Sequence, residues 1–208
     1  MKIGLLGGTF DPIHIGHLII AERMREALAL DRVIFIPAGR PPHRPVPAAS
    51  APERLEMVRL AIAGNEAFTF SEIELGRSGP SFTYETVQAL LSEYGPGHEW
   101  HLILGLDAFR EIGTWHRLAE LVQLVQFAVA DRPGFRPPEA VPPGVRYQRL
   151  ELGLFPVSGR EIRERAARGE SIRYLVTDAV YRYINSRRLY RPAEVRPETA
   201  APKTGKGR

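Results

Sequence analysis

The chain has 208 residues, of which 44% are hydrophobic and 25% charged, and it contains no cysteine. This composition is typical of a globular protein with one sizeable core, and it excludes a disulfide framework, a thiolate metal site and a cysteine nucleophile. The formal net charge is +4, but positions 1–190 hold 23 basic against 22 acidic residues, so a nearly neutral body argues against nucleic acid as a partner.

The N-terminal half alternates strand and helix patterns. The apolar run at residues 2–6 ends in Gly7-Gly8, and residues 17–30 carry apolar side chains at helical spacing. A β-rich run follows at residues 33–39, and then a Pro-rich loop. Ser50 and Glu53 form a capping box that starts a helix over residues 52–64. This order predicts β-α-β-α.

The same alternation continues to the C-terminus. Because strands that alternate with helices form parallel sheets, we expect a doubly wound, Rossmann-like α/β fold with helices on both faces. Residues 1–190 are predicted to form one domain, and residues 191–208 a disordered basic tail. The remaining elements are strands at 68–75, 100–105, 125–134 and 145–152, and helices at 82–94, 107–112, 159–169 and 177–189, the last capped by Thr177.

No apolar run reaches the roughly 20 residues that cross a bilayer, and glycines and charge interrupt the N-terminus before a signal-peptide core can form. We therefore expect a cytoplasmic protein without a membrane partner.

The segment GGTFDPIHIGHL at residues 7–18 is the most informative stretch. In a doubly wound sheet, Gly7 and Gly8 lie at the carboxyl edge, where they let the backbone approach an anion. The helix that begins near Gly16 directs its N-terminus to the same place. His14 and His17 project there and can donate hydrogen bonds to phosphoryl oxygens. The pattern predicts a phosphate site.

Other interpretations of this segment stay open. Paired glycines mark many tight turns, and a histidine pair can bind zinc, although no third ligand lies nearby in the sequence. The segment matches neither the G-x-G-x-x-G fingerprint nor the P-loop, so neither a dehydrogenase nor a P-loop NTPase is supported.

The stretch His14-Ile15-Gly16-His17 resembles the T/H-x-G-H signature of the nucleotidyltransferase superfamily. Further segments resemble, in order and spacing, the motifs of bacterial nicotinate mononucleotide adenylyltransferases (the NadD family), and only the tail is unmatched. These segments are PPHR (41–44), ELGRSGPSFTYETVQAL (74–90), GLDAFREIGTWHRLAEL (105–121), ADRPG (130–134) and SGREIRERAARGESIRYLV (158–176).

The resemblance implies transfer of AMP from ATP to nicotinate mononucleotide, which gives deamido-NAD and pyrophosphate in NAD biosynthesis. Catalytic roles would fall to His14, His17 and Arg163, which grip the triphosphate. Mg²⁺ would arrive with ATP, bound mainly through ATP oxygens and with few or no protein ligands. Implied ATP-binding residues are Gly7, Gly8, Thr9, Phe10, Gly16, Gly105, Asp107 and Ser158.

The resemblance also implies an acceptor site. Trp115 would stack on the pyridine ring, and Thr83 at a helix start would hold the carboxylate. His43, Arg44 and Arg132 would contact the acceptor's phosphate or carboxylate. Without the resemblance, Trp115 is equally a core residue, Thr83 a helix cap, Asp107 an N-cap and His43 a solvated loop residue.

The C-terminal motif departs from the family. Relatives commonly carry further hydroxyl residues after the position of Ser158, whereas this chain has Gly159 and Arg160. Contacts from those hydroxyls are lost, while backbone N–H groups at the helix start can still serve a phosphate, and Arg160 can add a cation.

Three alternative functions remain at this point. A nucleotide-binding module would bind ATP without releasing pyrophosphate, and a nucleic-acid-binding protein would act through its basic tail. An adenylyltransferase that prefers the amide nucleotide is the alternative within the enzyme class. A homo-oligomer is compatible with all of them.

Overall fold

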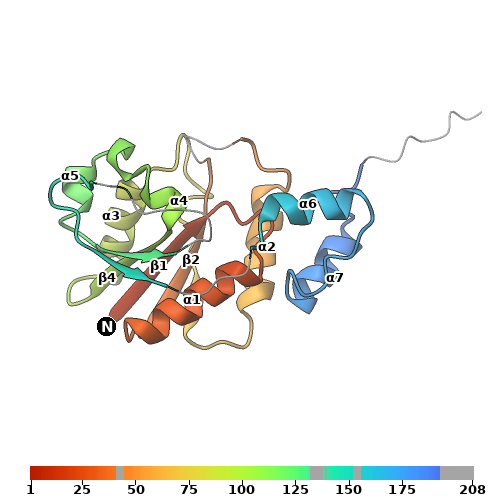
Figure 1. Cartoon of the computed structure of the whole chain (residues 1–208), viewed down its shortest axis with the longest axis horizontal. Coiled ribbons are helices and arrows are strands. Elements are labelled where there is room, and N and C mark those ends of the chain that lie inside the picture. The colour runs from red at the N-terminus through yellow and green to blue at the C-terminus, as the bar shows by residue number, and fades with distance from the viewer. Residues whose placement is uncertain (41–44, 132–137, 139, 152–155, 193–208) are drawn as a thin grey trace, which may run out of the picture.

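We analysed a computed structural model, which describes residues 1–40, 45–131, 138, 140–151 and 156–192. Six parallel strands form one sheet in the order β3-β2-β1-β4-β5-β6 (Figure 1). The order reverses between β1 and β4, which is the topological switch point where ligands bind in such sheets. The strands are β1 (Lys2–Gly8), β2 (Arg32–Pro37), β3 (Phe68–Phe70), β4 (Glu99–Gly105), β5 (Gln126–Ala130) and β6 (Tyr147–Leu150).

Helices cover both faces of the sheet (Figure 1). The chain orders them as α1 (Ile15–Ala27), α2 (Ala51–Ile62), α3 (Thr83–Tyr94), α4 (Leu106–Phe109), a 3₁₀ turn η1 (Ile112–Thr114), α5 (Leu118–Leu121), α6 (Gly159–Ala167) and α7 (Asp178–Ser186). In Figure 1, the blue helices α6 and α7 lie beside α2, away from α3, α4 and α5.

Two hydrophobic clusters follow from the alternation of side chains along each strand. In β2, Val33 and Phe35 join the cluster under α1, α2, α6 and α7. Their neighbours Ile34 and Ile36 join the cluster under α3 and α5. Because both faces are buried, the central strands are almost continuously apolar, which is typical of a parallel sheet.

The predicted doubly wound fold is confirmed, with differences at the ends of elements. The third strand was expected to reach residue 75 but ends at Phe70, and residues 73–76 form turns. The helix expected at 107–112 is split between α4 and η1, and α5 was not predicted. The Ser50–Glu53 capping box is present, and Thr177 caps α7 by accepting from the N–H of Val180.

The ends of two predicted strands, at 132–134 and at residue 152, and the tail after residue 192 lie outside the described residues. No helix in the described part is long and apolar enough to cross a bilayer.

Candidate active site

A cavity of about 1060 Å³ opens where β1 and β4 end. Every predicted site residue that the structure describes lines it: Gly7, Gly8, Thr9, Phe10, His14, Gly16, His17, Thr83, Gly105, Asp107, Trp115, Ser158 and Arg163. The other three, His43, Arg44 and Arg132, lie outside the described residues. Segments that are more than 150 positions apart in sequence therefore meet at one site.

The β1–α1 loop forms one wall of the cavity. A Cβ on Gly8 would lie 2.8 Å from the ring of Phe10, whereas a Cβ on Gly7 would meet nothing within 4 Å. Phe10 takes a left-handed conformation (φ 50°), and its buried ring packs edge-on against His17, with centroids 5.0 Å apart. Gly8 is thus required by the close approach of Phe10, while Gly7 leaves open space for a ligand.

The two histidines form a stacked pair. Their ring centroids are 3.7 Å apart and the planes differ by 24°. The backbone N–H of His14 donates to Nδ1 of His17 at 3.2 Å. Because Nδ1 accepts this bond, neutral His17 carries its proton on Nε2. His17 is therefore a hydrogen-bond donor through Nε2.

The start of α1 is only partly available for an anion. The N–H of Ile15 donates to the carbonyl of Leu175 at 3.0 Å, so one of the first N–H groups is already used. This bond also joins the segment between α6 and α7 to the start of α1.

Asp107 lies at the end of β4, in the first turn of α4. Gly105 is the N-cap of α4, so the alternative that Asp107 caps this helix is wrong. A Cβ on Gly105 would lie 2.6 Å from Oδ1 of Asp107. Because Gly105 has no side chain, the Asp107 carboxylate can lie close to it at the carboxyl edge of the sheet.

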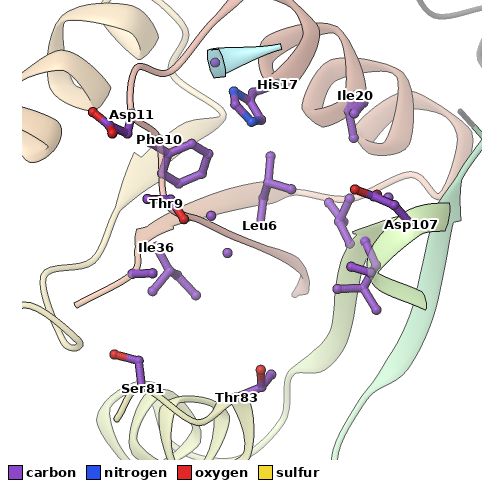
Figure 2. A pocket seen from close by; sticks show the side chains of 18 of the residues that line it. Leu6, Thr9, Phe10, Asp11, His17, Ile20, Ile36, Ser81, Thr83 and Asp107 are labelled. Carbon is purple, nitrogen blue, oxygen red and sulfur yellow. The ribbon is translucent and has the colours of Figure 1, made fainter. Parts of the chain in front are cut away.

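Thr83 and Trp115 lie on another wall. Figure 2 shows Thr83 and Ser81 across the cavity from His17. Thr83 is the first residue of α3, and Phe82 is its N-cap without a side-chain bond, so the alternative that Thr83 caps its helix is wrong. Trp115 is partly buried: it packs against the hydrophobic cluster under α3 and α5 and also lines the cavity, so it is not a fully buried core residue.

Helix α6 closes the site from the C-terminal side. Ser158 accepts a hydrogen bond from the N–H of Glu161 at 3.2 Å, and Arg163 donates through Nη1 to the carbonyl of Asp11 at 2.6 Å. A Cβ on Gly159 would lie 3.0 Å from that carbonyl. The glycine that departs from the family pattern therefore permits α6 to approach the β1–α1 loop closely. Arg160 pairs with Glu164 at 2.8 Å.

Sequence reasoning missed three buried charged groups around the cavity, those of Asp11, Arg54 and Glu74. Arg54, from α2, is 1% exposed and donates through Nη1 to the carbonyl of Thr9 at 2.7 Å. Burial lowers its pKa, and the nearby Asp11 carboxylate opposes that shift. Asp11 lies within the first motif, but the sequence does not indicate which residues far along the chain it contacts.

Glu74, also missed, is buried between β3 and α3. It accepts from the hydroxyl of Thr86 at 2.8 Å and from the N–H of Gly39 at 3.4 Å. Burial raises the pKa of its carboxyl, and these hydrogen bonds partly offset the shift. The side chain thus joins the end of β2 to α3 beside the cavity.

Among the described residues, no group of three or more His, Asp or Glu side chains is placed to hold a metal ion. The cavity is lined by nitrogen donors, those of His14, His17 and Arg163, and also by carboxylates, among them those of Asp11, Asp107 and Asp131.

Solved structures share this fold. The nicotinic acid mononucleotide adenylyltransferase of Plasmodium falciparum complexed with NaAD superposes with a TM-score of 0.77 at 18% identity, covering 91% of this chain and 97% of that chain. The same enzyme complexed with APC gives a TM-score of 0.75, also at 18% identity, with 91% and 96% covered.

Sequence relationships are closer. Residues 5–165 match the family model described as cytidylyltransferase-like. A probable nicotinate-nucleotide adenylyltransferase of Exiguobacterium sibiricum is 46% identical over 190 residues, covering 91% of this chain and 99% of that protein. One of Trichlorobacter lovleyi is 44% identical over 214 residues, covering 92% and 100%. The chain therefore belongs to the nicotinate-nucleotide adenylyltransferase family, within the cytidylyltransferase-like nucleotidyltransferases.

Proposed function

We propose that the protein transfers AMP from ATP to nicotinate mononucleotide, giving deamido-NAD and pyrophosphate. The main support for this function is that the H-I-G-H loop, Trp115 and the start of α3 all line the same cavity. One end of the cavity suits a triphosphate, and the other suits an aromatic ring with a carboxylate. Residues 1–190 act as one nucleotidyltransferase domain in this proposal, in the cytoplasm.

The triphosphate lies against α1 and α6. His17 donates from Nε2 to a phosphoryl oxygen, and Arg163 provides its remaining N–H groups to the same charge. Asp107, at the end of β4, accepts from ribose hydroxyls. His14 supports His17 by stacking and takes part in phosphate binding from the same helix entrance.

The acceptor lies near α3. Trp115 stacks on the pyridine ring, and Thr83 with the N-terminal N–H groups of α3 receives the carboxylate. His43, Arg44 and Arg132 are assigned to the acceptor's phosphate or carboxylate by the family resemblance alone. The nicotinate carboxylate would distinguish the acid from the amide at this helix N-terminus, because the partial positive charge there favours an anion.

The reaction requires no protein nucleophile. A phosphate oxygen of the acceptor attacks the α-phosphorus of ATP, the bond from this phosphorus to the bridging oxygen breaks, and pyrophosphate leaves with the bond electrons. The protein positions two anions and stabilises the charge that develops on the transferring and leaving groups. Mg²⁺ carried in with ATP would supply further charge neutralisation.

The experiment is pyrophosphate release from ATP and Mg²⁺ with nicotinate mononucleotide, nicotinamide mononucleotide or phosphopantetheine at equal concentrations. We expect a strong preference for the first acceptor, with deamido-NAD identified by mass. A preference for the second would make the protein an amide-nucleotide adenylyltransferase. ATP binding without pyrophosphate release from any acceptor would overturn the enzymatic function in favour of a binding module.

A further inference from the structure

Asp11 is the centre of a buried hydrogen-bond network behind the phosphate loop. Its carboxylate is 5% exposed. Oδ2 accepts from the N–H of Ala48 at 2.7 Å, and Oδ1 accepts from the N–H of Ala49 at 3.0 Å. Figure 2 shows this carboxylate directed away from the cavity centre. Asp11 therefore ties the loop before α2 to the β1–α1 loop.

The same residue holds Arg163 from α6. Nη1 of Arg163 donates to the carbonyl oxygen of Asp11 at 2.6 Å and lies 3.8 Å from Oδ2. A guanidinium has five N–H donors in a rigid plane, so a bond at one corner sets the direction of the others. The position of Asp11 thus decides where the free edge of Arg163 lies in the cavity.

Tyr190 completes the network from the far end of the described chain. Its hydroxyl donates to Oδ1 of Asp11 at 2.9 Å and lies 3.9 Å from the sulfur of Met57. Burial and the Asp11 carboxylate both raise its pKa, so the hydroxyl stays protonated and remains a donor. Tyr190 is 179 residues from Asp11 in sequence, and it is not among the residues that line the cavity.

We propose that Tyr190 is a positioning residue for the triphosphate site: its hydrogen bond to Asp11 fixes the β1–α1 loop, and through that loop the orientation of Arg163. The proposal rests on the proposed function for the identity of the nucleotide. It extends that function by making the segment after α7 part of the catalytic framework.

The test is binding of a non-hydrolysable ATP analogue, with Mg²⁺, to the full chain and to Tyr190→Phe. The phenylalanine keeps the ring in its packing environment and removes only the hydroxyl. We expect the analogue to bind about tenfold more weakly, the scale of losing a hydrogen bond to a charged group. Tyr183→Phe is the matched control, because Tyr183 packs against the same hydrophobic cluster from α7, and it should bind as the wild type does.

A double-mutant cycle separates positioning from general destabilisation. If Tyr190 acts through Arg163, Tyr190→Phe should weaken binding in the wild-type background and have little effect in an Arg163→Ala background. Equal losses in both backgrounds, or unchanged binding with only a lower melting temperature, would overturn the proposal.

If Tyr190→Phe fails to fold, Asp11→Asn tests the same link, because it weakens the acceptor of the Tyr190 hydroxyl. Weaker analogue binding that disappears in the Arg163→Ala background is expected, and equal losses in both backgrounds would overturn the proposal. Since these are binding measurements, they remain decisive even if no acceptor supports turnover, which would refute only the proposed function.

Discussion

His17 combines two tasks at one residue. Its Nδ1 accepts from the backbone of His14, which stabilises the entrance of α1 and makes Nε2 the donor atom of the neutral ring. An imidazole held in this way does not have to reorient before its N–H donates. This preorganisation favours stabilisation of the negative charge that develops on the phosphate during the reaction.

Replacing His17 by alanine should leave the fold intact and reduce turnover by about 10²-fold or more, the scale of losing one transition-state donor. Turnover is measured by pyrophosphate release, and folding by thermal denaturation. His98→Ala is the control, since His98 is not among the residues that line the cavity. Near-normal turnover of His17→Ala would remove this residue from the mechanism.

Trp115 is tested by its effect on the acceptor. Trp115→Ala should raise the KM for nicotinate mononucleotide about five- to tenfold, because ring stacking contributes about 0.5–1.5 kcal/mol in addition to the buried area. The KM for ATP should change little, and Trp115→Phe should retain most of the acceptor affinity. An equal rise in both KM values would indicate that Trp115 acts as a core residue alone.

At the scale of elements, the approach of α6 to the β1–α1 loop determines which residues fit at its first turn. Gly159→Ala should weaken ATP binding, because the new Cβ would lie 3.0 Å from the carbonyl of Asp11, the same oxygen that holds Arg163. Gly76→Ala is the matched control, since a Cβ there meets nothing within 4 Å. Binding is measured by titration with an ATP analogue. If Gly159→Ala bound the ATP analogue with unchanged affinity, the β1–α1 loop would be able to shift without weakening binding.

At the junction between β2 and α3, Glu74 should make the stability of the fold depend on pH. Burial raises the pKa of Glu74 in the folded state. The folded protein therefore binds this proton more tightly than the unfolded chain, and stability falls as pH rises from the unfolded pKa through the raised folded value. Glutamine does not titrate, so the free energy of unfolding of Glu74→Gln should not show this decrease. Relative to the wild type, the variant should therefore become more stable as pH rises over that interval. Parallel stability curves against pH would contradict the assignment.

At the scale of the whole molecule, all described residues that line the cavity precede position 164, and the positioning network among the described residues extends to Tyr190. A chain truncated after residue 192 should therefore keep wild-type turnover and melting temperature. Binding of the truncated chain and of the full chain to a DNA duplex at low salt is then compared. This comparison tests whether the tail binds polyanions. Loss of turnover on truncation would show that the tail contributes to the site.

The sequence by itself determined the order of elements and the chemistry of the first loop. Both are local: apolar periodicity specifies strand and helix, Ser50 and Glu53 specify a helix start, and the H-I-G-H stretch holds its histidines and glycines within a few residues. The third strand was one exception, beside the unpredicted α5, because residues 71–75 continue an apolar alternation although pairing with β2 stops at Phe70.

Only the tertiary structure decided which distant residues meet. Asp11, Arg54, Arg163 and Tyr190 belong to four separate segments, and no periodicity or spacing relates them. Their contacts arise because α2, α6 and the segment after α7 pack on the same face of the sheet as α1. A buried carboxylate is tolerated in that place only when several donors surround it, and the fold alone supplies them.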